Sequence, residues 1–208
     1  MKFKDGILIE WTGNFKEHLI PKTNRTSRPQ NKMIPKHITI HNTGNPGASA
    51  LANSKYVDNA KAYVSWHFTI GNGIVYQELP INENAWHAGD GSRGEGNRQS
   101  IGIEIAEVDG AYETAVEFIR DLLEYLDFTT DQVFPHKHWS GKNCPRLILP
   151  KWNEFIEDIS RQYPENLSEW ARKGFDYVLN NKLSDGTRPK ENVTREELWT
   201  ILERIKNG

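Results

Sequence analysis

Three segments of the 208-residue chain alternate apolar and polar positions with the period of two that is typical of β-strands: residues 37–41, 63–70 and 101–107. In each segment the large apolar residues share one face, and a few polar residues occupy the other. The polar faces carry His41, His67 and Glu104. The pattern therefore predicts strands with one face against a core and one face free for chemistry.

Other segments show helical spacing or the signals of turns. Apolar residues recur every three or four positions in residues 112–127, and weaker patterns predict helices over 49–61 and from Pro150 onward. A hairpin partner is expected at 74–79 and a short strand at 132–134. Strands interleaved with helices indicate an α/β fold with a mixed central β-sheet flanked by helices.

The two ends of the chain differ from this central pattern. Residues 1–35 mix short apolar pieces with Pro, Asn and Arg and predict an irregular arm with one short strand. A proline near position 163 marks a boundary, so we expect a main domain over 1–163 and a small helix-loop-helix module over 164–208. Thr194 and Glu197 form a capping box at the second helix of this module. About forty residues are marginal for folding alone, so the module is expected to dock or to self-associate.

Composition narrows the class of protein. A charged fraction of 26% and a hydrophobic fraction of 37% are typical of a globular domain, and the net charge of −2 argues against nucleic acid as a partner. Residues 165–208 carry eight basic and eight acidic side chains, so this segment has no net charge and is also not expected to bind nucleic acid. An apolar run of three residues near the N-terminus predicts no signal peptide, and no run is long enough for membrane insertion. We therefore expect synthesis in a cytoplasm, without export by the general route.

The segment PHKHWSGKNCP at 135–145 contains the single cysteine of the chain. Cys144 stands in a polar loop, which disfavours the usual interpretation of a lone cysteine as a small buried apolar residue. Zinc prefers nitrogen and sulfur ligands, and a catalytic zinc site has three protein ligands. His136 and Cys144 supply two, and His41 is the third candidate. His138 competes with His136, because side chains two positions apart in an extended segment point to the same side.

Further candidates surround this predicted site. Glu104, flanked by strand isoleucines, is expected to act as a general base or to orient a histidine ligand. Lys142 is either solvated or placed to stabilise an oxyanion. His67, Trp86 and His87 are candidates for substrate binding, with structural or solvent-exposed roles as the alternatives for the histidines. The G-x-G-x-x-G motif at 89–94 precedes a strand, so we interpret it as a flexible wall of the cleft rather than a dinucleotide site.

The segments HITIHNTGN, SWHFTI, AWHAGDG, SIGIEIAE and HKHWSGKNCP follow in this order within residues 35–160. Together they resemble the zinc-dependent N-acetylmuramoyl-L-alanine amidases of the amidase-2 type, a group similar to peptidoglycan recognition proteins. The resemblance implies one Zn²⁺ per chain, cleavage of the amide between muramic acid and L-alanine in peptidoglycan, and roles for individual residues. It makes His41, His136 and Cys144 the ligands, Glu104 the catalytic acid/base, and Lys142 the support of the tetrahedral intermediate. Many relatives carry Asp at the position of His138.

The C-terminal segment resembles a single surface-layer-homology-like repeat of the kind appended to phage and prophage lysins. This implies an endolysin that acts on the cell wall, with peptidoglycan as substrate. The module is expected either to bind a cell-wall polymer or to mediate a homodimer. A non-catalytic peptidoglycan-binding protein of the same fold is the alternative, and the complete set of candidate catalytic residues argues against it.

Overall fold

The structure is a computed structural model that describes residues 1–59, 61–164 and 166–207. Backbone packing divides the chain into two compact units, Met1–Ser160 and Arg161–Gly208. Within the described ranges, no helix is both long and apolar enough to span a membrane.

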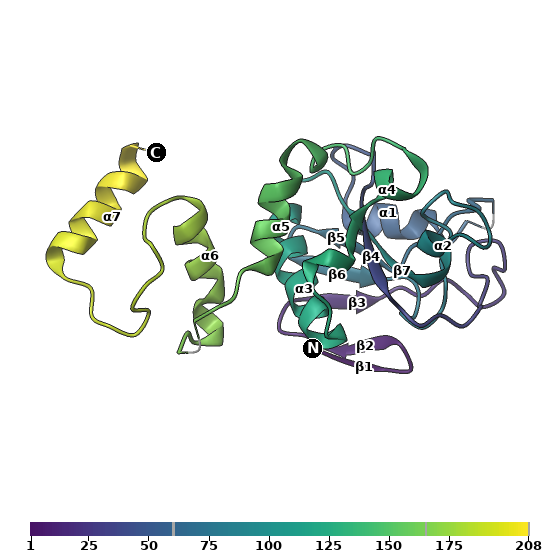
Figure 1. Cartoon of the computed structure of the whole chain (residues 1–208), viewed down its shortest axis with the longest axis horizontal. Coiled ribbons are helices and arrows are strands. Elements are labelled where there is room, and N and C mark those ends of the chain that lie inside the picture. Colours follow the sequence, from purple (N-terminus) through teal and green to yellow (C-terminus); the bar gives the residue numbers. More distant parts are fainter. Residues whose placement is uncertain (60, 165, 208) are drawn as a thin grey trace. The chain divides into compact units, whose positions relative to one another are not determined.

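A six-stranded mixed sheet forms the centre of the first unit, in the order β3-β6-β5-β7-β4-β8 (Figure 1). The strands are β3 (Phe15–Glu17), β4 (His37–Asn42), β5 (Phe68–Gly71), β6 (Ile74–Gln77), β7 (Ser100–Ile105) and β8 (Val133–Pro135). Strands β4, β5, β7 and β8 run parallel to one another, and β6 pairs antiparallel with β5. The predicted mixed sheet flanked by helices is confirmed.

The apolar face of the sheet packs against two helices, α3 (Ala111–Leu126) and α5 (Trp152–Ser160). Phe118 of α3 places its ring 4.8 Å from that of Phe68 on β5, and both side chains are fully buried. Phe155 brings α5 into the same core. The apolar face of the strands therefore packs against the apolar stripe of α3, as their sequences predict, because each is apolar on one side only.

Helix α1 (Ala50–Tyr56) approaches the opposite face of the sheet, where the polar side chains lie. Gly71 of β5 permits this approach, because a Cβ atom there would lie 2.7 Å from the Cβ of Ala50. Glu78, just after β6, is fully buried. Burial raises the pKa of its carboxyl well above the usual value, and the hydroxyls of Ser54 and Thr69 offset part of that rise. Short helices α2 (Glu95–Gln99) and α4 (His136–Ser140) complete this unit.

The N-terminal arm is more ordered than its sequence predicts. It forms a hairpin of β1 (Lys2–Lys4) and β2 (Ile7–Glu10) and then adds β3 to the edge of the central sheet. Asp5 and Gly6 both have positive φ at the hairpin turn, and an Asp-Gly pair is a strong local signal for such a turn. Trp11 donates its indole N–H to Asp121 of α3. The expectation of an irregular arm with one strand was therefore wrong.

Some predicted elements are shorter than their patterns. The predicted strand over 63–70 starts only at Phe68, because Trp66 turns aside to donate to the Thr69 hydroxyl and to pack in a second apolar cluster. The predicted helix over 49–61 ends at Tyr56. Pro150 lies in a short 3₁₀ turn, η2 (Leu149–Lys151), that leads into α5, and another, η1 (Thr130–Gln132), precedes β8.

The second unit contains a 3₁₀ turn, η3 (Glu169–Ala171), and the helices α6 (Arg172–Asn180) and α7 (Arg195–Asn207). The predicted capping box is present: Thr194 Oγ1 accepts from the Glu197 N–H, and the Glu197 carboxylate accepts from the Thr194 N–H. Local signals thus predicted the start of α7 correctly.

Candidate metal centre

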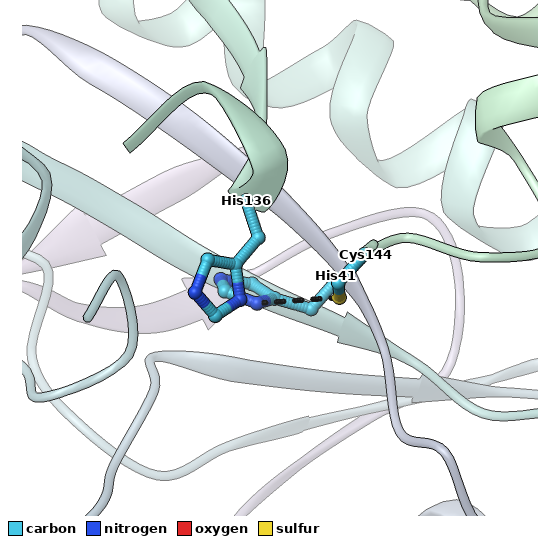
Figure 2. Close-up of side chains that lie close together, drawn as sticks. All are labelled: His41, His136 and Cys144. Carbon is cyan, nitrogen blue, oxygen red and sulfur yellow. Dashed lines mark hydrogen bonds between the residues drawn. The ribbon is translucent and has the colours of Figure 1, made fainter. Parts of the chain in front are cut away.

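Strand β4, the first residue of helix α4 and one loop bring together His41, His136 and Cys144 (Figure 2). His41 lies on β4, and His136 follows β8, the neighbour of β4 in the sheet. Trp139 donates its indole N–H to Thr39 of β4, which anchors α4 against the sheet. The Lys137 N–H donates to the Cys144 carbonyl and closes the loop that returns the cysteine to the histidines.

The three candidate ligand atoms lie within 4.8 Å of one another, and all three residues are buried. The Cys144 Sγ is 3.8 Å from the His41 Nδ1. Tetrahedral zinc with bonds of about 2.0–2.3 Å holds its ligand atoms about 3.3–3.8 Å apart, so these residues fit a zinc ion after small adjustments. In the described part of the chain, neither buried ring nitrogen of His136 has a hydrogen-bond partner. A metal ligand requires such a free nitrogen.

The protonation of these groups suits a metal. Burial, and to a smaller extent the positive charge of Lys142, lower the pKa of His136 to about 4. Burial also holds the pKa of His41 well below its ordinary value. Both imidazoles are therefore neutral at neutral pH, as ligands must be. Burial raises the pKa of the Cys144 thiol to about 11, so a metal has to displace its proton.

A chain of hydrogen bonds sets the orientation of His41. His87 is neutral because burial lowers its pKa to about 3, and its Nε2–H donates to the Ser100 carbonyl at 3.2 Å. Its Nδ1 must then accept the hydrogen bond from His41 Nε2, at 3.0 Å. This leaves the Nδ1 of His41 deprotonated and facing Cys144. His87 therefore selects the His41 tautomer that can bind a metal.

Glu104 lies beside this cluster because β7 pairs with β4 in a register that places His41 opposite Glu104. Its Oε1 is 3.9 Å from the His41 Nδ1, and its buried Oε2 has no hydrogen-bond partner in the described ranges. Burial raises the pKa of Glu104 to about 8; the charge of Lys142 opposes this rise, and that of Glu107 adds to it. A carboxyl with such a pKa can exchange a proton near neutral pH.

Two pockets of about 400 and 680 Å³ adjoin the cluster: His41 and His136 line the smaller pocket, and His136 also lines the larger one. Their linings share five residues: Val64, Trp86, His87, His136 and Lys142. Glu104 lines the smaller pocket and Gly91 the larger. Trp86, His87 and Lys142, which were predicted to line the active-site cleft, therefore lie in the walls of both pockets.

His67 and His138 lie elsewhere. His67 is fully buried, its Nδ1 accepts from the Gly102 N–H, and its Nε2 bonds the Glu83 carbonyl. With both nitrogens occupied, it has no group left for a substrate, which argues against the predicted contact. His138 is exposed and stacks on Phe134 at 4.4 Å, because residues 136–140 are helical rather than extended. Helical geometry turns it away from His136.

The glycine-rich segment at 89–94 forms a wall of the larger pocket, and it is anchored at Asp90. The Asp90 carboxylate accepts from the N–H groups of Gly96 and Asn97 at the start of α2. Asn97 in turn accepts from the N–H of His87. Sequence reasoning expected a flexible wall and missed Asp90 and Asn97. The sequence signal for this anchor is Asp90 itself, an acidic residue six positions before Gly96, the residue whose N–H it accepts.

Comparison with known proteins identifies a family and similar sequences. Residues 29–147 match the family described as N-acetylmuramoyl-L-alanine amidase. The chain is similar to N-acetylmuramoyl-L-alanine amidases from Bacillus subtilis: CwlH, 48% identical over 70% of this chain and 60% of CwlH, and XlyA, 46% identical over 64% of this chain and 47% of XlyA. It thus spans about half to three fifths of these relatives.

Solved structures show the same fold. The catalytic domain of XlyA is 44% identical, with a TM-score of 0.67 over 70% of this chain and 99% of that domain. PlyL is 32% identical, with a TM-score of 0.65 over 71% of this chain and 98% of that structure. Both matches cover about the length of the first unit.

Proposed function

Because the chain belongs to the N-acetylmuramoyl-L-alanine amidase family, we propose that it hydrolyses the amide bond between N-acetylmuramic acid and L-alanine in peptidoglycan. The observation that carries this proposal is the buried cluster of His41, His136 and Cys144 with Glu104 beside it, at the junction of two pockets. A non-catalytic binding protein would need neither a free ligand set nor a carboxyl with a pKa near neutrality.

We assign one zinc ion to this cluster as cofactor. The donor set of two neutral imidazoles and one thiol matches zinc, and three protein ligands leave one coordination position open. A zinc ion held by these three residues would supply Lewis-acid polarisation of the scissile carbonyl.

Glu104 and Lys142 are assigned the proton and charge chemistry. Glu104 in its carboxylate form would take a proton from the attacking water and return it to the leaving L-alanine amine, and its Oε2, which has no hydrogen-bond partner among the described residues, is available for this transfer. Lys142 lines both pockets, so its ammonium can lie next to the carbonyl oxygen as negative charge develops there. The peptide carbonyl and the water are thus held between a base and a cation.

The neighbouring residues have supporting roles in this proposal. His87 keeps the His41 Nδ1 free through its hydrogen bond. Trp86 lies in the lining of both pockets and offers a flat apolar surface to the substrate. His67 links the Gly102 amide to the Glu83 carbonyl and acts as a brace for β7.

We further propose that the chain acts as an endolysin, since relatives of known structure carry the same catalytic fold. Hydrolysis is assigned to residues 1–163, and residues 164–208 are assigned to a separate module without catalytic residues. The module bears no cluster like that of His41, His136 and Cys144 among its described residues.

Digestion of purified Gram-positive cell walls tests the activity. The proposal expects new L-alanine amino termini without new reducing sugar ends, and reducing ends alone would contradict it. Glu104→Gln should lower turnover about 10²–10⁴-fold while the zinc content stays at one per chain. Retained turnover would exclude Glu104 as the base, and His138→Ala serves as the matched control that should remain active.

A further inference from the structure

Cys144 differs from the two histidines of the cluster in the kind of segment that carries it. His41 stands on strand β4 and His136 at the start of α4, whereas residues 141–148 form neither helix nor strand. Ligands on regular elements are held more precisely than ligands on loops. Bond lengths in metal sites vary by only about 0.2 Å, so the Cys144 sulfur needs support from outside its own loop.

The side chains of Asn42 and Glu107 tie this loop to the central sheet. Asn42, the last residue of β4, accepts from the Leu147 N–H through its Oδ1 at 3.0 Å. Glu107, two positions beyond the end of β7, forms an ion pair with Arg146. Arg146 follows Cys144 by two positions, so the ion pair acts on the backbone next to the ligand.

The Glu107 carboxylate joins two segments that border the metal centre. Its Oε1 accepts from the Gly44 N–H at 3.1 Å, in the segment after β4, and its Oε2 accepts from the Arg146 guanidinium. The Glu107 side chain is only 3% exposed, whereas Arg146 is 44% exposed. A carboxylate that is shielded from water is costly without a cation beside it. The guanidinium is therefore held at this carboxylate.

We propose that the Glu107–Arg146 ion pair positions the metal ligand Cys144. The pair fixes the loop beside the end of β7, and the loop then keeps the Cys144 Sγ at 3.8 Å from the His41 Nδ1. Neither member of the pair is among the described lining residues of the two pockets, so the pair acts through Cys144 and not on substrate. The inference rests on the metal centre of the proposed function but not on which bond is hydrolysed.

Alkylation of Cys144 in the full chain without metal tests this positioning directly, because the chain has a single cysteine and its residue is 5% exposed. A reagent reaches the thiol when the loop opens. Arg146→Met removes the guanidinium and should raise the alkylation rate about tenfold. Arg146→Lys retains a cation and should stay within about threefold of the unmodified chain.

The control Arg28→Met separates positioning from general stability. It breaks the Arg28–Glu83 ion pair of the same unit, whose side chains are 5% and 19% exposed and lie outside the Cys144 loop. This variant should lower Tm but change the alkylation rate less than about twofold. Equal rises in Arg28→Met and Arg146→Met would show that the rate reports the stability of the whole unit, which overturns the proposal.

Competition with a chelator measures the consequence for the metal. Arg146→Met should lower zinc affinity about tenfold, and adding Glu107→Gln should cause little further loss because both changes remove the same ion pair. When Cys144 is replaced by alanine, Arg146→Met should no longer affect the remaining affinity, since the sulfur is gone.

A loss that persists in the Cys144→Ala background overturns the proposal. So does an Arg146→Met chain whose alkylation rate or zinc affinity stays within about twofold of the unmodified chain. If these measurements agree with the proposal while cell-wall digestion yields no new L-alanine amino termini, the proposed hydrolysis is wrong and the positioning role stands.

Discussion

Replacing His87 with alanine removes the acceptor that orients the metal ligand His41. The His41 Nε2–H donates to His87 Nδ1 at 3.0 Å, and His41 is only 2% exposed, so water has little access to replace that acceptor. A buried donor left without its partner costs about 1–3 kcal/mol. Because about 1.4 kcal/mol corresponds to a factor of ten, zinc affinity should fall about 5- to 150-fold. This range includes the 10- to 100-fold that is typical for residues that orient metal ligands.

Competition with a chromophoric chelator measures this affinity without reference to catalysis. His87→Asn is the matched variant, since the asparagine Oδ1 can occupy the place of the histidine Nδ1 and accept the same hydrogen bond. It should retain affinity within about fivefold of the unmodified chain. His138→Ala removes an exposed histidine near the cluster and should change nothing. An affinity of His87→Ala within twofold of the unmodified chain would refute the reasoning, and so would an equal loss in both His87 variants.

Three further changes test other parts of the structure. Lys142→Met should lower turnover about 10²–10³-fold with unchanged zinc content, and full activity would exclude its assigned role. Deleting residues 161–208 should leave hydrolysis of soluble muropeptides intact, whereas loss of activity in a folded fragment would show that the units cooperate. Glu78→Gln should raise Tm at about pH 8 but not at about pH 4. The pKa of Glu78 is raised in the folded state, whereas in the unfolded chain it is about 4.3, so the carboxyl favours the unfolded state increasingly as pH rises above about 4.3. An equal change in Tm at both pH values would contradict this.

The buried faces of β4, β5 and β7 and the starts of α3 and α7 follow from local patterns, and these were predicted correctly. Ile38 and Ile40 belong to the core, and His41 lies on the other face. The capping box at Thr194 has its expected partners. Such features depend on periodicity and on hydrogen bonds within a few residues, so they can be read from the sequence alone.

Features that depend on contacts between distant segments were predicted poorly. Nothing local in the N-terminal arm indicates that β3 will pair with β6, or that Trp11 will meet Asp121. The strand pattern at His67 is as regular as that at His41, yet backbone groups from β7 and the loop before Trp86 occupy both of its nitrogens. The helical turn at His136 replaced an expected extended segment and thereby separated His138 from the cluster.

The residue types needed for metal chemistry, and the strand face on which each stands, can be read from the chain alone, because alternation is a property of a single strand. The register in which β4 pairs with β7, which sets Glu104 beside His41, appears only in the folded protein, since register depends on how separate strands meet. The orientation of His41 by His87 likewise depends on folding, because that hydrogen bond joins residues 46 positions apart. The candidate centre thus combines ligands visible in the sequence with an arrangement that only folding creates.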